Sequence, residues 1–317
     1  MFSTLLTTNR ELSINTKSVI VLTSRTDSFS MFSDISPGAD SVITSLVTFL
    51  TVVHTLGQPS VKAVIKERAP ERNVLFALFD GEAFDYIGSS RTVFDMSSGN
   101  FPVDSDYKKG EALNMSQIQT KHFSHFIELN QLGLRGNDTQ THKLFIHKNI
   151  DPNPELNVLT KTIITNAKDV PDLQFENISD GSPLPPSSLQ TFLKYDNSLI
   201  GIVIANHRKE YTNKYYNSLY DDFDKLGVEM SKLAKSLTNI ATIISKSIFD
   251  LLIPRSNLTE NNELNITSNE KLMENLLNCY LINTSCSLFN TVYKEEGNPL
   301  PLNNTNSISK LFDSIKR

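Results

Sequence analysis

Residues 72–90 read RNVLFALFDGEAFDYIGSS. The apolar run from Val74 to Phe79 predicts a buried strand, and the polar turn behind it leads into a predicted helix. In open α/β sheets, binding and catalytic groups gather at the carboxyl ends of strands, so Asp80 and Glu82 stand where chemistry is expected. The alternative is that this acidic pair only ends the strand and opens the helix.

The sequence on both sides of this stretch repeats the pattern of strand and helix. A β-branched run predicts a strand over 19–22, and apolar residues at helical spacing predict a helix from Asp40 or Ser41 to Val53. Strand, helix and strand form the unit of a parallel sheet. Further predicted elements are a strand within 123–134, a helix over 154–164, a buried strand over 199–205, an amphipathic helix over 228–252 and a shorter helix over 270–281.

These elements predict an α/β fold with a mostly parallel central sheet and helices on both faces. Residues 97–115 are polar and are expected to form a surface loop. We expect residues 1–253 to form the main lobe, and residues 254–317 an Asn-rich linker with a helical continuation of the same ectodomain.

Composition narrows the class of protein. The chain is 39% hydrophobic and 21% charged, which is typical of a globular protein. Its net charge of -5 and scattered basic residues argue against a nucleic-acid partner. No segment is expected to span a membrane, since the best candidate, 237–253, is interrupted by polar residues and reads as an amphipathic helix. The N-terminal residues lack the pattern of a secretory signal.

Glycosylation sequons point to a lumenal or extracellular environment. The motif Asn-x-Ser/Thr occurs at Asn114, Asn137, Asn177, Asn257, Asn265, Asn283 and Asn303. The two cysteines, Cys279 and Cys286, could close a small disulfide loop in an oxidising compartment or could be two free thiols on one helix. Their number and spacing do not favour a zinc finger.

Several short blocks carry a family resemblance. Asp85-Tyr86-Ile87-Gly88-Ser89 follows the strand, and the other blocks are TSRTDS (23–28), PGADS (37–41), PLPPSSLQ (183–190) and NKYYNSLYD (213–221). In this order and rough spacing they resemble the nicastrin family, the large glycoprotein subunits of γ-secretase, whose ectodomain has the Asp-Tyr-Ile-Gly-Ser motif behind such a strand. The resemblance extends to about residue 253.

The resemblance implies a non-catalytic lobe with a zinc-aminopeptidase-like sandwich fold and no cofactor. It implies assembly with presenilin and two small membrane subunits, with cleavage performed by presenilin. The lobe would restrict access of single-span membrane-protein substrates by the size of their ectodomains. The chain is then expected to be an internal part of a membrane-associated glycoprotein of the ER, Golgi, plasma membrane and endosome, with its signal peptide and transmembrane helix missing.

The resemblance also singles out individual residues. Glu82 and Tyr86 match family positions implicated in assembly and in contact with the substrate N terminus. The motif residues Asp85, Ile87, Gly88 and Ser89 are further candidates. The alternative for Tyr86 is a structural role, as a buried aromatic ring that packs the motif helix.

Related zinc aminopeptidases hold two zinc ions, and this sequence departs from their ligand pattern. Their His-x-Asp reads Arg25-Thr26-Asp27, their bridging Asp falls on Ser41, their Glu-Glu reads Gly81-Glu82, and their late His falls on Asn217. Zinc needs about four N, O or S ligands, which these residues do not supply. We expect Arg25 to pair with Asp27 or Glu82 where zinc lies in the enzymes.

The histidines do not restore a metal site. His147 and His207 are isolated in the sequence and are interpreted as surface or capping residues. No Gly-x-Ser-x-Gly elbow or Gly-rich phosphate loop occurs. Two alternatives remain open, a divergent active zinc aminopeptidase with unexpected ligands and a free-standing extracellular binding module.

Overall fold

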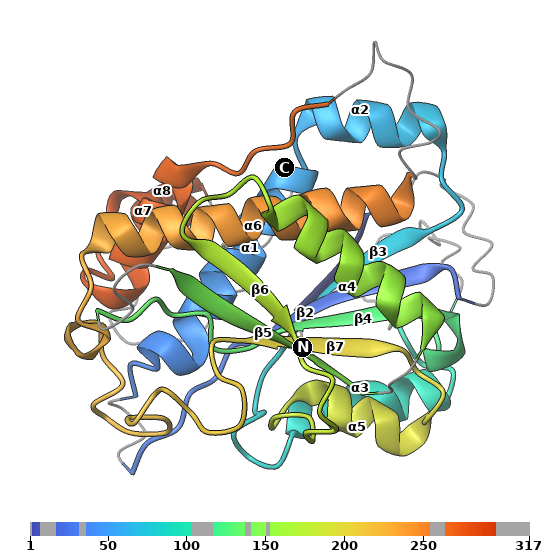
Figure 1. Cartoon of the computed structure of the whole chain (residues 1–317), viewed down its shortest axis with the longest axis horizontal. Helices are drawn as coiled ribbons and strands as arrows, with labels where there is room; N and C mark the ends of the chain where they lie inside the picture. The colour runs from blue at the N-terminus through green and yellow to red at the C-terminus, as the bar shows by residue number, and fades with distance from the viewer. Residues whose placement is uncertain are drawn as a thin grey trace.

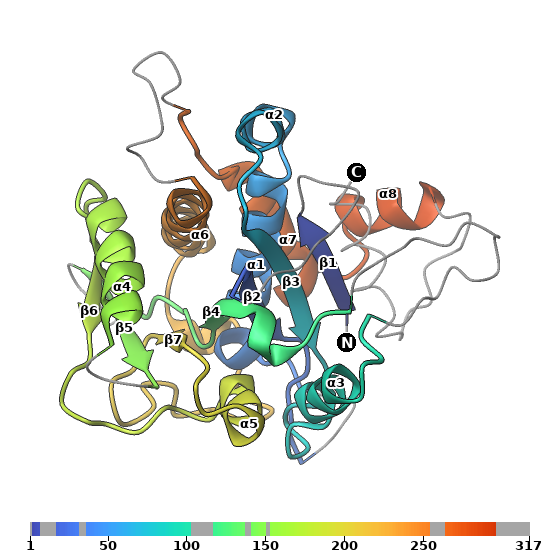
Figure 2. The ribbon, with the colours of Figure 1, turned by 90° about the vertical axis from the view of Figure 1, so that its right-hand side faces the viewer.

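The computed structural model describes residues 2–6, 17–31, 36–102, 117–136, 141–149, 153–253 and 264–295. Within these ranges the centre of the fold is a seven-stranded sheet with helices on both faces (Figures 1 and 2). The strands lie in the order β1 (Phe2–Leu6), β3 (Asn73–Phe79), β2 (Val19–Arg25), β4 (Phe123–Leu129), β7 (Gly201–Ala205), β5 (His142–Lys148) and β6 (Leu173–Asn177).

The sheet is mostly parallel, as the sequence predicts. The four strands from β3 to β7 run parallel to one another, and β5 and β6 are parallel to each other. The edge strand β1 is antiparallel to β3, and β5 is antiparallel to β7. The carboxyl ends of β3, β2, β4 and β7 therefore meet at one edge of the sheet, where ligands bind in such folds.

The helices are α1 (Thr44–Leu56), α2 (Pro59–Arg68), α3 (Ile87–Ser97), α4 (Pro154–Ala167), α5 (Ser188–Tyr195), α6 (Met230–Leu252), α7 (Glu270–Leu281) and α8 (Ser287–Glu295). Figure 2 shows α1, α6 and α7 on one side of the sheet and α3 and α5 on the other. Alternate strand residues feed these two layers. Ile20 and Leu22 join the core under α1 and α6, whereas Val19 and Val21 join the core over α3 and α5.

Helix α1 lies at the centre of the larger core. A π-helical turn, Ala39–Ile43, leads into it, and nearly all of its residues are buried. Among the described residues, the stretch Ala39–Leu56 is long and apolar enough to cross a membrane, but 89% of it is buried inside the fold. The sequence analysis interpreted 237–253, its best candidate for a span, as an amphipathic helix, and α6 (Met230–Leu252) confirms that interpretation; the segment nearest to a span is instead Ala39–Leu56. A helix covered on all sides by protein is apolar on every face, and this explains why Ala39–Leu56 is apolar enough to resemble a membrane span.

Most predicted elements are confirmed, with boundaries shifted by a few residues. The structure adds β1, β5, β6, α2, α5 and α8, which the sequence reading did not identify. Strand β5 was not predicted because His and Lys residues interrupt its apolar residues; Lys143 is exposed, and Phe145 and Lys148 are half-buried. Most of the predicted loop at 97–115 and much of the predicted linker at 254–268 lie outside the described residues.

The C-terminal helices pack into the same core as the sheet. Met273, Leu276 and Leu277 of α7 lie in the cluster that contains α1 and α6. Cys279 of α7 and Cys286, directly before α8, are joined in a disulfide. The alternative of two free thiols on one helix is therefore not what the structure shows, since the two residues belong to different helical segments.

Candidate functional site

A cavity of about 260 Å³ opens at the carboxyl edge of the sheet. It lies where β2, β3 and β4 end, and the segments 186–188 and 216–217 close its other side. Of the residues predicted from the sequence, it is lined by Arg25, Glu82, Asp85, Tyr86 and Asn217. The structure thus brings the motif after β3 together with three of the six metal positions, Arg25, Glu82 and Asn217.

Glu82 holds the start of α3. Its side chain is buried, one carboxylate oxygen accepts the Ser89 backbone N–H at 2.8 Å, and the other accepts the Ser89 hydroxyl at 2.8 Å. That second oxygen also accepts the Ser188 hydroxyl at 2.6 Å. A carboxylate at a helix N-terminus satisfies amide groups that have no partner within the helix. Burial raises the pKa of Glu82, while these hydrogen bonds act in the opposite direction.

Glu128, at the end of β4, caps the N-terminus of α5 as Glu82 caps that of α3. Its two carboxylate oxygens accept the backbone N–H groups of Ser188 and Leu189, each at 2.9 Å. Burial is the main cause that raises the pKa of Glu128 to about 8, and the nearby Glu82 raises it further. Ser188 therefore joins two buried carboxyls. The sequence reading missed Glu128 as a site residue, although a Glu within a run of buried strand residues was a usable signal.

Two glycines fix the shape of the loop between β3 and α3. Gly81 has a φ of +79°, in the left-handed region that favours glycine. This turn explains why Gly stands at the position of the first Glu of the enzymes' pair. A Cβ atom on Gly88 would overlap the backbone carbonyl oxygen of Asp80. The glycine of the Asp-Tyr-Ile-Gly-Ser motif is thus required for α3 to lie against the end of β3.

The other motif residues surround the mouth of the cavity. Asp85 and Tyr86 both have positive φ, and Asp85 is exposed. The Tyr86 side chain is half-buried, and burial raises its pKa to about 12, so the phenol stays neutral. Ile87 is 60% exposed, whereas Ser89 is fully buried. Asp85, Tyr86 and Ile87 are therefore the motif residues that a partner could reach.

Arg25 does not pair with the acidic residues that the sequence suggested. Its guanidinium donates to the Ser41 carbonyl oxygen at 3.1 and 3.0 Å and to the Tyr216 hydroxyl at 3.3 Å, and it lies over the Tyr216 ring. Asp27 instead accepts the backbone N–H groups of Glu82 and Ala83 at 2.9 and 2.7 Å. The prediction was wrong because backbone amides, rather than a cation, satisfy the carboxylates.

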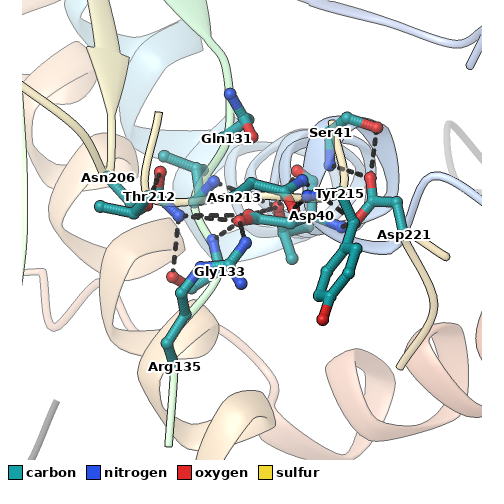
Figure 3. A network of polar contacts seen from close by, with 12 residues as sticks. Asp40, Ser41, Gln131, Gly133, Arg135, Asn206, Thr212, Asn213, Tyr215 and Asp221 are labelled. Carbon is teal, nitrogen blue, oxygen red and sulfur yellow. Dashed lines mark hydrogen bonds and ion pairs between the residues drawn. The ribbon is translucent and has the colours of Figure 1, made fainter. Parts of the chain in front are cut away.

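A second polar network, around Asp40 and Asp221, adjoins the cavity at Ser41, whose carbonyl oxygen accepts from Arg25 (Figure 3). Asp40 is buried, forms an ion pair with Arg135 at 2.5 Å, and accepts the Gly133 backbone N–H at 2.8 Å and the Asn206 amide at 3.0 Å. Asp221 accepts the Ser41 N–H at 3.0 Å and its hydroxyl at 2.6 Å. These bonds tie the start of α1 to the loops that follow β4 and β7.

The residues at the enzymes' metal positions do not fit a zinc ion. Arg25 places a permanent cation in the cavity. Ser41 and Asp27 are hydrogen-bonded to other groups of the protein, and Asn217 lies in an exposed turn with a φ of +53°. In the described ranges, no group of three or more His, Cys, Asp or Glu side chains is placed to hold a metal. The carboxylates that remain are engaged by helix N-termini and turns.

Three of the predicted sequons fall on described residues. Asn265 and Asn283 are exposed in loops, whereas the Asn177 side chain is half-buried at the end of β6. Asn114, Asn137, Asn257 and Asn303 lie outside the described residues. Asn265 and Asn283 are thus the described sequons most open to modification.

Comparison with known proteins gives a consistent result. The family model described as the nicastrin large lobe matches residues 18–249. Nicastrin of Mus musculus is 31% identical over 298 residues, and nicastrin of Homo sapiens is 30% identical over 302 residues, in each case covering 88% of this chain and 38% of the relative. The chain therefore spans little more than a third of the length of these relatives.

A solved structure has the same fold. The crystal structure of the γ-secretase component nicastrin aligns over 99% of this chain and 55% of its own, with a TM-score of 0.75 and 22% identity. An aminopeptidase from Aneurinibacillus sp. strain AM-1 aligns more weakly, with a TM-score of 0.48 over 78% of this chain. The α/β architecture predicted from the sequence is confirmed.

Proposed function

The chain belongs to the nicastrin family, and we propose from this premise that it forms the large-lobe part of a nicastrin subunit of γ-secretase. In this role it acts with presenilin and two small membrane subunits, and presenilin performs the cleavage. Its ectodomain lies in the lumen or outside the cell, with Asn265 and Asn283 as the described glycosylation candidates.

The lobe itself is proposed to be non-catalytic. The observation that carries this proposal is that the two buried acidic side chains of the cavity act as helix caps, Glu82 on α3 and Glu128 on α5. A general base must be free to take a proton from a bound water or substrate. Glu82 and Glu128 instead accept hydrogen bonds from donors of the protein, and Arg25 lines the same cavity. This arrangement disfavours the alternative of an active zinc aminopeptidase.

The cavity mouth is the proposed contact for single-span membrane-protein substrates. Asp85 is an exposed carboxylate beside the half-buried Tyr86 ring, a pair suited to a positively charged amino group. Glu82 lies deeper and supports this mouth through Ser89 rather than by a free charge. We therefore assign Asp85 and Tyr86 to contact and Glu82, Gly88 and Ser89 to the scaffold.

Co-purification tests the assignment to γ-secretase. Tagged protein expressed from the complete gene is isolated in mild detergent and examined for presenilin, which we expect to be recovered with it. Loss of presenilin from folded protein would overturn the proposal and favour a free-standing binding module.

Substrate contact needs a separate measurement in the assembled complex. Asp85→Asn removes the exposed charge at the mouth, and Asp169→Asn removes an exposed charge in the turn after α4 as a matched control. We expect only the first variant to weaken substrate capture while presenilin recovery stays unchanged. Equal capture by both variants would refute the contact role of Asp85.

A further inference from the structure

A second and larger cavity, of about 610 Å³, lies on the far side of the loop 180–186. Its other walls are His147 at the end of β5 and the segment 207–211 that follows β7. It shares Pro186 with the first cavity but none of the motif residues after β3. Its volume is in the range of sites that hold small molecules.

Two buried histidines line this cavity and lack hydrogen-bond partners. The His207 side chain is 2% exposed, and neither of its ring nitrogens forms a hydrogen bond to any residue that the structure describes. His147 is similarly buried, with one ring nitrogen 2.9 Å from the His207 backbone oxygen and the other without a described partner. Buried polar atoms are nearly always hydrogen-bonded, so these nitrogens call for partners from within the cavity. Both residues had been interpreted from the sequence as surface or capping histidines, and that prediction was wrong because both are buried.

The protonation state of the two histidines defines what such a partner must offer. Burial and the neighbouring His147 lower the pKa of His207 to about 4, so its ring is neutral near pH 7. Burial also lowers the pKa of His147. A neutral imidazole has one N–H donor and one acceptor nitrogen. A hydroxyl group matches either nitrogen, because it both donates and accepts hydrogen bonds.

The charged side chains at the rim of the cavity balance one another. Arg208 pairs with Glu176 at 3.3 Å and with Asp180 at 3.2 Å. Lys209 lies 3.8 Å from the same Asp180 carboxylate. Two cations thus stand beside two carboxylates, and the rim has no excess charge of either sign. A charged ligand would lose hydration on entering the cavity without meeting an unpaired opposite charge, so the cavity favours an uncharged ligand.

Much of the remaining wall is apolar. Pro183, Leu184, Pro185 and Pro186 form one side, and Tyr211 lies with its ring 4.7 Å from that of His207. Small-molecule sites commonly combine apolar walls with a few buried polar groups that fix the orientation of the ligand. A ligand that matches this wall has an apolar body with several hydroxyl groups. A sugar ring has both, since its C–H groups are apolar and its hydroxyls lie around the rim of the ring.

We propose that the second cavity is a binding site for a neutral sugar, either a free sugar or the end of a glycan. Hydroxyl groups of the sugar bond to the unpartnered nitrogens of His207 and His147, and its C–H groups pack on Tyr211 and on the prolines of the loop. The proposal does not depend on assembly with presenilin, so either can fail while the other stands.

Binding to the purified chain is measured by calorimetry near pH 7. The probes are glucose, mannose and galactose, each beside its uronate and its 2-amino analogue, which carry a negative and a positive charge. We expect at least one neutral sugar to bind at least about tenfold more tightly than both of its charged analogues. No binding of any neutral sugar, or equal affinity for a sugar and its charged analogues, would overturn the proposal.

A high-mannose oligosaccharide distinguishes the two sources of the sugar. Tighter binding of the oligosaccharide than of the single sugars supports the end of a glycan as the ligand, and weaker binding supports a free sugar.

NMR of the histidine ring signals locates the bound sugar. The sugar should shift the signals of His147 and His207 and leave the signal of His125 unchanged, since His125 is equally buried but does not line the cavity. Binding that leaves the signals of His147 and His207 unshifted would place the sugar elsewhere and overturn the proposal.

A matched pair of variants tests the role of the buried nitrogens. His207→Phe keeps a ring beside Tyr211 but removes both nitrogens, and we expect it to reduce the affinity by about tenfold or more. His125→Phe makes the same change away from the cavity and should leave the affinity unchanged. An equal loss in both variants would overturn the proposal. If His207→Phe fails to fold, the comparison of neutral with charged sugars and the NMR shifts still decide, because both use the unaltered chain.

Discussion

Glu128 makes the stability of this fold depend on pH in an unusual direction. Its pKa is about 8 in the folded chain against an ordinary value of 4.5, because the carboxyl is buried. Over the window between these values the folded state holds a proton that the unfolded state has lost. The free energy of unfolding therefore rises as the pH falls through 8. Between about pH 8.5 and about pH 6.5 this difference amounts to about 2 kcal/mol.

The lower end of the window is set by buried histidines. Burial lowers the pKa of His125 and of His207 to about 4, so each one destabilises the fold as the pH falls below its unfolded value of 6.5. At pH 6.5 each of these two histidines already lowers the free energy of unfolding by about 0.4 kcal/mol, so comparison with a Glu128 variant that keeps the histidines isolates the carboxyl effect. Burial also raises the pKa of Glu82, which acts in the same direction as Glu128.

Urea unfolding followed by far-UV circular dichroism measures the effect, since the chain has no tryptophan. We expect the unaltered chain to gain stability from about pH 8.5 to about pH 6.5 and Glu128→Gln to lose most of that gain. Glu67→Gln removes an exposed carboxylate on α2 and should leave the pH dependence unchanged. An equal pH dependence in the unaltered chain and in Glu128→Gln would refute the reasoning.

Three further substitutions test the architecture of the site by the same unfolding assay. Gly88→Ala should cost more than about 2 kcal/mol because its Cβ would overlap the Asp80 backbone. As a control, the Cβ of Gly181→Ala meets no atom within 4 Å, so this variant should cost only about 1 kcal/mol for its positive φ. Similar costs for the two variants would contradict the packing argument. Asp40→Ala should cost about 3 kcal/mol or more because it leaves a half-buried cation and two donors without their acceptor. A cost below about 1 kcal/mol would contradict that network's role. Replacing Cys279 and Cys286 together by Ser should cost about 2 kcal/mol through the loss of a short cross-link, with a reduced sample of the unaltered chain as the comparison, and equal stability with and without reductant would speak against the pairing.

Sequence patterns predicted those parts of the fold whose signals are local. The run ending at Phe79 predicted a buried strand, since no polar residue interrupts it. Apolar residues at helical spacing predicted α6. Short elements were not predicted from the sequence. Helix α5 has only eight residues, half of them polar, so its apolar pattern is too short to identify a helix from the sequence.

The position of the candidate site was predictable from the sequence, but its hydrogen bonds were not. The motif residues pointed to the edge of the sheet where the cavity lies. Which donor meets which carboxylate depends on contacts between distant segments, such as Ser188 with Glu82 or Asn206 with Asp40. No local sequence pattern encodes which distant groups come into contact. Opposite charges alone suggested that Arg25 pairs with Asp27 or Glu82, and the folded chain does not form that pair.

The same limit applies to the second cavity. His147 and His207 are 60 positions apart and looked unremarkable in the sequence, yet β5 and β7 are neighbours in the sheet. Their rings come within 5.9 Å of each other, centre to centre. Pairing of non-consecutive strands therefore created a feature that composition and spacing could not show.

The claim that this lobe is a pseudo-enzyme meets its most direct test in zinc content. The purified chain is dialysed against micromolar zinc and then against metal-free buffer, and zinc per chain is determined by elemental analysis. With its acidic side chains engaged by helix N-termini and Arg25 in the cavity, the chain should retain close to none. Retention of one or two zinc ions per chain, abolished by substitution of Glu82 or Asp27, would contradict the account and make an aminopeptidase the better interpretation.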